Sequence, residues 1–283
     1  MTSLLAALLC MGTISGRQVQ RVSSITGNVE AIPDFESKML GNKRAVHVYL
    51  PPGYVGSKET YPVLYMADGQ NVFDGATSFI PNQEWRADET AEAMIRGGLL
   101  RPIIIVAVDN AGVARADEYL PTRYKPKGFD QPIGGKADLY GRFMVEELMP
   151  AIADIYRVKP GPENTGLCGS SLGGVLALHL GMTYPNVFGK LAVVSPSFWW
   201  DSHLMLRRVK DLPGKKALKI WLDIGTKESS DAVQDTTDVR DALMAKGWEL
   251  GTDLAYFEDK GAKHNEVAWA RRFPMMLSFL FGR

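Results

Sequence analysis

Apolar residues recur along this chain with two different periods. Residues 44–50 alternate with period two, as in a half-buried strand, and residues 102–108 are apolar almost throughout, as in a strand buried on both faces. Longer segments between such runs carry the helical period. The pattern predicts strands over 29–32, 44–50, 61–67, 102–108, 167–168, 191–194, 217–224 and 253–257 and helices over 84–95, 137–156 (kinked at Pro150), 202–209, 232–246 and 266–281. Strands that alternate with helices predict an α/β fold, in which a mostly parallel eight-stranded sheet has helices on both faces.

The composition fits one soluble globular domain. The chain has 283 residues, of which 46% are hydrophobic and 23% charged, and its formal net charge is zero. This balance argues against a phosphate-tracking surface, so no nucleic acid is expected as a partner. Neither cysteine, Cys10 or Cys168, has a metal-ligand spacing, and we expect neither a metal site nor a cofactor.

The first 20 residues are apolar and then small, which resembles a secretory signal peptide without its basic start. The alternatives are a short surface helix or a misplaced start codon, and the signal peptide is favoured over both. We therefore expect one catalytic domain over 21–283, secreted or periplasmic if the leader is removed and cytoplasmic otherwise. The apolar stretch is too short to span a bilayer, and the oligomeric state stays open.

The most informative motif is Gly169-Ser-Ser-Leu-Gly173, which reads G-x-S-x-G between a strand-like and a helical run. This context is that of a nucleophile elbow in an α/β-hydrolase fold, with Ser171 exposed on a strained turn. We expect glycine at both flanks because side chains there would clash in so tight a turn. The amide of Leu172 should point to the position where an oxyanion forms.

A serine needs an adjacent base, and the chain has four histidines. His47 lies within an early strand, His179 two turns along the helix after the elbow, and His203 ahead of any suitable acid. In this fold the base follows the last strand, which favours His264. Its alternative is a surface histidine of a polar loop.

The acid should follow the strand predicted over 217–224. Glu228 is the first choice and Asp231 the second, because both lie in the next loop. Either carboxylate could instead be the N-terminal charge of the following helix. Asp223 is inside the strand and is expected to face a neighbouring element.

Further candidates lie in loops after strands. The amide of Gln70, after Asp68 and Gly69, is the expected second oxyanion donor, although an Asp-Gly turn is common. Substrate contacts are expected from the polar loop residues Asp68, Asn110 and Arg115. They are also expected from the aromatic pair Trp199 and Trp200, which would either line a pocket or belong to the core.

Together these stretches resemble the putative-esterase family of α/β-hydrolases, in its esterase D and enterobactin-esterase branch, over roughly residues 28–280. The matching pieces include residues 44–54, 61–73 and 108–110, the elbow, 195–200, 225–228, and 264–266 with Trp269. The resemblance implies a nucleophile at Ser171, a base at His264, an acid at Glu228 and oxyanion amides at Gln70 and Leu172.

The resulting prediction is a serine carboxylesterase that cleaves a soluble small-molecule or oligosaccharide ester, of carbohydrate, feruloyl or siderophore type. Two alternatives stay open. An acyltransferase would use the same acyl-enzyme and pass it to a sugar hydroxyl, whereas a non-catalytic binding protein would keep the scaffold without the reaction.

Overall fold

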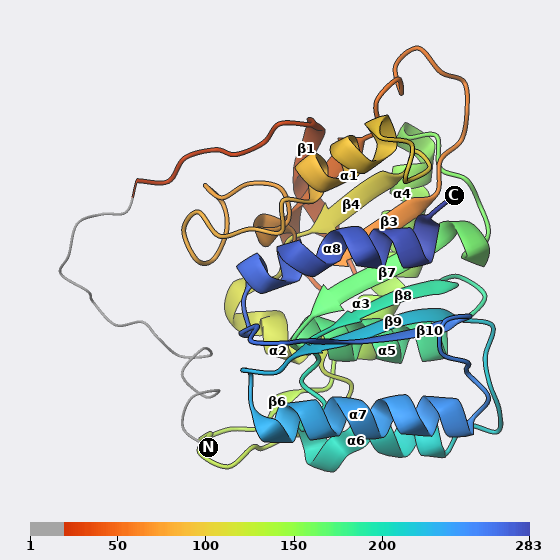
Figure 1. Ribbon diagram of the computed structural model, residues 1–283. Helices are drawn as coiled ribbons and strands as arrows, with labels where there is room; N and C mark the ends of the chain where they lie inside the picture. The colour runs from red at the N-terminus through yellow and green to blue at the C-terminus, as the bar shows by residue number, and fades with distance from the viewer. Residues whose placement is uncertain (1–19) are drawn as a thin grey trace.

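The computed structural model describes residues 20–283, and its centre is an eight-stranded sheet in the order β1-β2-β4-β3-β7-β8-β9-β10 (Figure 1). Strands β1 and β2, and β2 and β4, pair antiparallel, and all later pairs are parallel. The predicted α/β-hydrolase architecture is confirmed. The strands are β1 Asn28–Ser37, β2 Asn42–Leu50, β3 Val63–Ala67, β4 Ile104–Val108, β7 Thr165–Ser170, β8 Lys190–Val194, β9 Lys219–Gly225 and β10 Leu254–Asp259.

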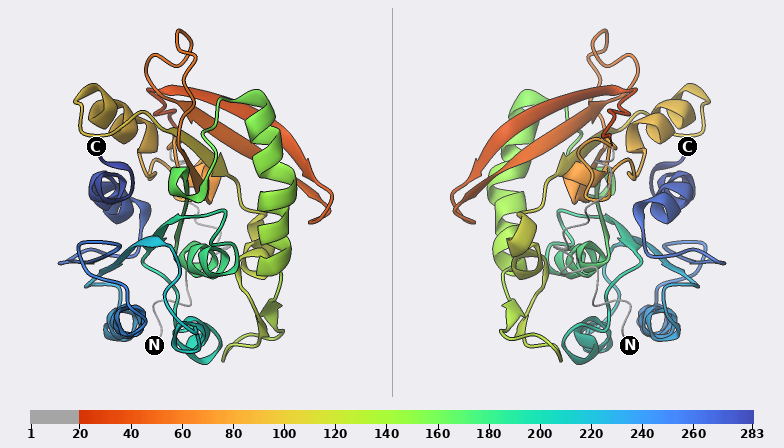
Figure 2. Two further views of the ribbon diagram at one scale, coloured as in Figure 1. Left: turned by 90° about the vertical axis from the view of Figure 1, so that its right-hand side faces the viewer. Right: turned by 90° about the vertical axis from the view of Figure 1, so that its left-hand side faces the viewer.

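Helices cover both faces of this sheet because its central strands are apolar on both sides. In β4, Ile104 and Val106 pack into one core and Ile105 and Ala107 into the other. Helices α1 and α8 form the second core with one face, and the other helices pack on the opposite face (Figures 1 and 2). The helices are α1 Ala87–Arg96, α2 Arg115–Tyr119, α3 Ala137–Arg142, α4 Met149–Ile155, α5 Leu172–Thr183, α6 Trp200–Lys210, α7 Ser230–Ala245 and α8 Glu266–Phe281.

The helix predicted over 137–156 forms one continuous rod (Figure 2), but its middle turns are not α-helical. Between α3 and α4 lies a π-helical segment, η4 Phe143–Leu148. The departure from α-helical geometry therefore precedes Pro150 instead of centring on it. Pro150 has no N–H to donate back to the preceding turn, and the wider π turn accommodates that gap.

Two other predicted helices start later than expected, each after left-handed backbone. The helix predicted from Glu84 begins at Ala87, because Arg86 has φ 53°. Within α6, Asp201, Ser202 and His203 all have positive φ, so regular helix follows His203. The long segment between β4 and α3 contains α2 and a small hairpin of β5 Arg123–Tyr124 and β6 Ile133–Gly134. These pieces are too short to show a hydrophobic period.

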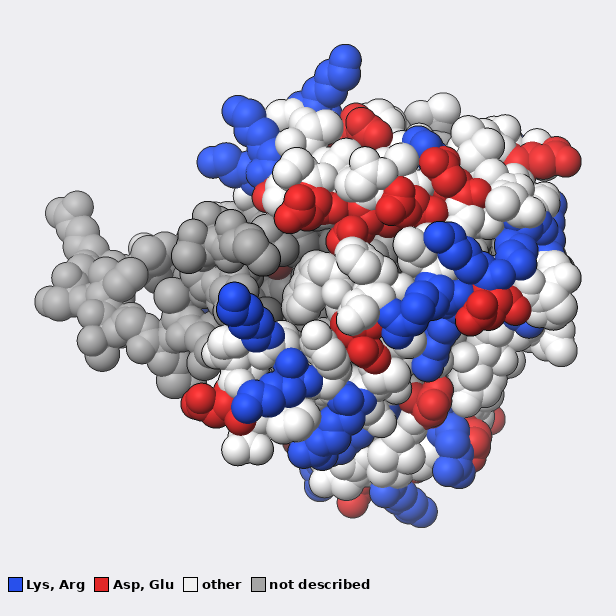
Figure 3. All heavy atoms as spheres, turned by 90° about the horizontal axis from the view of Figure 1, so that it is seen from below, with Lys and Arg blue, Asp and Glu red and all other residues white. Residues whose placement is uncertain are grey.

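Positive and negative side chains intersperse on the face seen from below, where α6 and α7 lie (Figure 3). This agrees with the zero formal net charge. Among residues 20–283, no helix is long and apolar enough to cross a membrane. The predicted leader, residues 1–20 with Cys10, falls almost wholly outside the described part of the chain. Cys168 is a buried free thiol in β7.

Candidate active site

Ser171 occupies the turn between β7 and α5 in a strained conformation, with φ 59° and ψ −119°. Its N–H donates to the carbonyl of Val194 at 3.0 Å, and its own carbonyl accepts from the amide of Ser197 at 3.0 Å. These bonds tie the turn to the end of β8 and hold the strained backbone in place. The Oγ of Ser197 lies 3.3 Å from the Oγ of Ser171.

The two glycines of the motif differ in what they permit. A Cβ on Gly169 would lie 2.2 Å from the carbonyl oxygen of Gly173, so no side chain fits there. A Cβ on Gly173 would meet only ordinary contacts, the nearest at 3.5 Å from Asp68. The expectation that both flanks exclude side chains is therefore right for Gly169 and wrong for Gly173.

The amides of Leu172 and Gln70 each lie in the first turn of a helix. Leu172 is the first residue of α5, and Gln70 belongs to the short 3₁₀ helix η2 Gly69–Asn71 after β3. N–H groups at such positions have no acceptor within their own helix, which leaves them available to an anion. A Cβ on Gly69 would lie 2.7 Å from the backbone of Val108, so glycine is needed for η2 to approach β4.

His264 lies between β10 and α8 and is in contact with Glu228, which lies between β9 and α7. Its Nδ1 is 2.7 Å from Oε2 of Glu228, whose side chain is only 1% exposed. The other carboxylate oxygen accepts from the Ser195 hydroxyl at 2.6 Å and from the Gly225 amide at 2.9 Å. Burial alone would raise the pKa of Glu228, but these donors, His264 first, hold it below its usual value.

Contact with an acid does not by itself single out His264. His47 pairs with Asp109 at 3.1 Å and His203 with Asp235 at 3.1 Å. His179 pairs with Asp138. What distinguishes His264 is its place beyond the carboxyl end of a parallel strand, the edge at which Ser171 also lies, together with the deep burial of its carboxylate partner.

Ser195, at the end of β8, connects the acid to α8 and was not predicted from the sequence. Its hydroxyl donates to Glu228 and accepts from Trp269 Nε1 at 3.0 Å and Arg272 Nη2 at 2.8 Å. Arg272 is also paired with Asp223 at 3.2 Å, and both side chains are buried. Asp223 thus faces a neighbouring helix, as expected, and burial raises its pKa to about 6.

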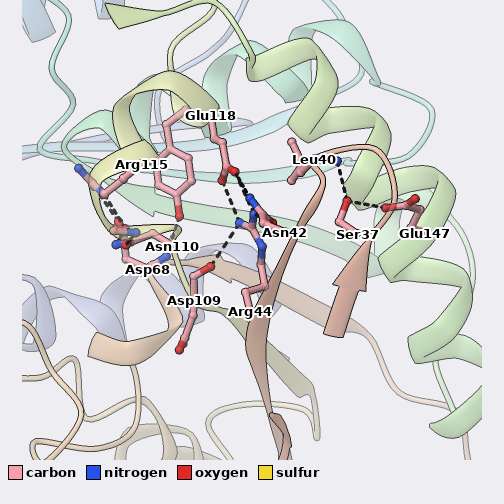
Figure 4. A network of polar contacts seen from close by, with 12 residues as sticks. Ser37, Leu40, Asn42, Arg44, Asp68, Asp109, Asn110, Arg115, Glu118 and Glu147 are labelled. Atoms are coloured by element: carbon pink, nitrogen blue, oxygen red, sulfur yellow. Dashed lines mark hydrogen bonds and ion pairs between the residues drawn. The ribbon is translucent and has the colours of Figure 1, made fainter. Parts of the chain in front are cut away.

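The polar residues predicted to contact substrate form a network among themselves (Figure 4). Asp68 accepts two bonds from Arg115, at 2.6 and 2.7 Å, and one from the Asn110 side chain at 2.7 Å. Because Asp68 is 4% exposed, its role as a substrate contact is corrected to one of positioning Arg115. Arg115 and Asn110 are half-buried and remain candidates.

The aromatic pair divides between core and surface. Trp200 is 1% exposed and its indole N–H donates to Thr122 at 3.1 Å, so its predicted substrate contact is wrong and it belongs to the core. Trp199 is half-buried, with its ring centroid 5.9 Å from that of Trp200. Asp231, the second choice of acid, is exposed in the first turn of α7.

Comparison with known proteins gives one family and several relatives. Residues 37–280 match the family described as putative esterase. Over 206 residues the chain is 27% identical to the ferri-bacillibactin esterase BesA of Bacillus subtilis, covering 66% of this chain and 67% of that protein. Over 260 residues it is 26% identical to an endo-1,4-beta-xylanase/feruloyl esterase of Xylanibacter ruminicola, covering 90% of this chain and 31% of that protein.

The fold is similar to the crystal structure of the enterobactin esterase FES from Shigella flexneri in the presence of enterobactin. The TM-score is 0.71 at 20% identity, over 92% of this chain and 60% of that one. The chain therefore spans less than two thirds of the Shigella and Xylanibacter proteins. The family match includes the segments that carry Ser171, Glu228 and His264.

Proposed function

This chain belongs to the putative-esterase family and is a carboxylesterase, and we propose that it cleaves its ester through an acyl-enzyme formed on Ser171. His264 takes the hydroxyl proton as Ser171 attacks the carbonyl carbon, and then gives it to the departing alcohol. A water molecule activated by the same histidine hydrolyses the acyl-enzyme. The reaction consumes one ester and one water and yields an acid and an alcohol.

The observation that carries this proposal is the contact between His264 and buried Glu228. With Nδ1–H donated to the carboxylate, the basic lone pair is on Nε2, the nitrogen that a serine hydroxyl would approach. A carboxylate held below its usual pKa stays charged at neutral pH and stabilises the imidazolium that forms during attack. Glu228 is therefore the proposed acid in preference to Asp231.

The proposed oxyanion hole consists of the amides of Leu172 and Gln70. Both are fixed by backbone packing rather than by flexible side chains, and fixed donors need no reorganisation as charge develops. Removing one such donor typically costs about 10²–10³-fold in turnover.

We propose a soluble ester of the feruloyl or siderophore type as the substrate. The proposal is supported by two relatives whose names describe a ferri-bacillibactin esterase and a feruloyl esterase. Half-buried Arg115 and Asn110 beside the Gln70 loop offer polar donors to such a substrate. Transfer of the acyl group to a sugar hydroxyl would use the same steps with a different final acceptor.

The test compares Ser171→Ala with Ser170→Ala, a buried neighbour in β7. The substrates are nitrophenyl acyl esters, feruloyl and acetyl sugars, and a catecholate trilactone. We expect the Ser171 change to lower kcat by about 10⁶-fold and to abolish labelling by a fluorophosphonate, since the residues of such a set act as a unit. Activity that survives in the Ser171 variant would contradict the mechanism. Products that shift from acid to sugar ester when sugar is added would identify a transferase.

A further inference from the structure

Three carboxylates meet where the chain enters α1, away from the proposed catalytic set. Glu84, Asp88 and Glu89 each contribute one oxygen to a group whose members all lie within 4.8 Å of one another. Asp88 is 0% and Glu84 6% exposed, and Glu89 is half-buried. Sequence spacing alone did not reveal this cluster, because nearby acidic residues usually lie on a solvated helix face.

Each of the three carboxylates uses one oxygen for a protein donor. The Ser24 hydroxyl donates to Oε1 of Glu84, and the amides of Thr26 and Gly27 donate to Oδ2 of Asp88 at 2.8 and 2.9 Å. Oε1 of Glu89 accepts from the guanidinium of Arg86 at 3.1 Å. These donors leave the second oxygen of every carboxylate free for another partner.

The second oxygens are buried and unpartnered. Glu84 Oε2, Asp88 Oδ1 and Glu89 Oε2 have no hydrogen-bond partner among residues 20–283. The three carboxylates repel one another, and their one ion pair within residues 20–283 is with the mostly exposed side chain of Arg86.

We propose that Glu84, Asp88 and Glu89 bind a hard divalent cation, Ca²⁺. Carboxylate oxygens without histidine or cysteine suit Ca²⁺, Mg²⁺ or Mn²⁺ and do not suit zinc. The three oxygens lie no more than 4.8 Å apart, and two oxygens on opposite sides of Ca²⁺ are separated by about 4.6–5.2 Å, twice the usual Ca–O distance, so one Ca²⁺ can reach all three. Mg²⁺ demands near-ideal octahedral geometry and keeps several of its waters, whereas Ca²⁺ accepts an irregular set of protein oxygens such as this one.

The cation would fasten three separate segments: residues 24–27, the loop that carries Glu84, and the first turn of α1. That junction continues into the Gln70 loop, because the amide of Trp85 donates to the carbonyl of Asn71 at 2.9 Å and that of Ala87 to Val72 at 3.2 Å. The expected effect is therefore on the stability of this junction, and the cation takes no part in ester cleavage.

The test measures thermal unfolding of the whole protein after chelation, with CaCl₂, MgCl₂ or MnCl₂ added. We expect Ca²⁺ at about 1–10 mM, above the roughly 0.1–1 mM dissociation constants of weak carboxylate sites, to raise the unfolding temperature of the wild type in a saturable way. Tb³⁺, a luminescent substitute, should bind with emission sensitised through Trp85 and should be displaced by Ca²⁺. Glu249→Gln, at an exposed carboxylate, should behave as the wild type.

Two variants distinguish the cation from a shared proton. Glu89→Gln should unfold at a higher temperature than the wild type in chelator, because repulsion is relieved, and at a lower one in saturating Ca²⁺, because a ligand is lost. Asp88→Asn should likewise be more stable than the wild type in chelator and less stable in saturating Ca²⁺. If this variant fails to fold, Glu89→Gln still decides the test, because Glu89 is only half-buried. No response of the wild type to any of the three cations would overturn the proposal, as would variants more stable than the wild type in both conditions. A larger rise with Mg²⁺ than with Ca²⁺ would overturn the choice of Ca²⁺.

Discussion

Glu228 and the cluster of Glu84, Asp88 and Glu89 are two sets of buried carboxylates with opposite surroundings. Both oxygens of Glu228 accept hydrogen bonds, and its pKa is held below the usual value. In the cluster, one oxygen of every carboxylate has no protein donor among the described residues, and the pKa values of Glu84 and Glu89 are raised by burial. Both sets of carboxylates are buried, so the number of hydrogen-bond donors decides which set stays ionised without a bound cation.

The origin of the donors explains this difference. Glu228 receives them from three separate places: the end of β9, the end of β8 and the loop before α8. The three carboxylates of the cluster lie within positions 84–89, in the loop before α1 and in its first turn, and each receives donors on one oxygen only, from residues 24–27 or from Arg86. Glu228 is a single carboxylate with donors for both of its oxygens, whereas three like charges close together in one short segment share too few donors and need a ligand from outside.

The largest predicted difference between the two carboxylate sets is in kcat. Glu228→Gln should lower kcat by about 10³–10⁴-fold, because an amide can leave His264 in the wrong tautomer and cannot stabilise its positive charge. Glu89→Gln should cost less than tenfold, because its carboxylate belongs to the other set. Steady-state kinetics on one nitrophenyl ester measures both. Equal losses would show that the two carboxylate sets are not functionally distinct.

A second effect tests whether the donors to Glu228 matter as a network. Ser195→Ala removes the hydroxyl that joins Glu228 to Trp269 and Arg272, leaving buried polar groups unsatisfied. We expect the free energy of unfolding to fall by about 1–3 kcal/mol and kcat to fall as well, with KM little changed. Thr236→Val, which removes another buried hydroxyl, is the control and should leave kcat unchanged. If kcat is unaltered in the Ser195 variant, the network contributes to stability and not to catalysis.

The distance along the sequence between contacting residues also explains which features could be predicted. The elbow was recognisable because its strand, turn and helix are contiguous around Ser171. The contact between Glu228 and His264 followed from the order of strands in the fold. The bond from Arg272 to Ser195 spans 77 residues, and no local pattern reports it. The left-handed turns at Arg86 and His203 were missed because nothing in their residue types requires them.

A smaller effect concerns pH. Because the pKa of Glu228 is lower in the folded protein than its ordinary value of 4.5, its contribution to stability is present above pH 4.5 and lost as pH falls through the folded pKa. The wild type should therefore exceed Glu228→Gln in stability at pH 7. This difference should shrink in acid. Denaturant unfolding at pH 7 and in steps below pH 4.5 measures it, and a constant difference would contradict the assigned shift.

The smallest effect concerns Asp231, the other carboxylate of the Glu228 loop. It is exposed in the first turn of α7, where the Ser229 side chain already caps the helix by accepting from the Ala232 amide at 3.0 Å. Asp231→Asn should therefore lose only the interaction of a charge with the helix dipole, about 0.3–1 kcal/mol, and salt should screen it. Unfolding at low salt and in 1 M NaCl measures this loss, and kcat should change less than twofold. A large fall in kcat with Asp231→Asn and a small one with Glu228→Gln would move the catalytic acid to Asp231. We expect the reverse, because the buried carboxylate of Glu228 already contacts the imidazole of His264, whereas Asp231 is an exposed, screened charge.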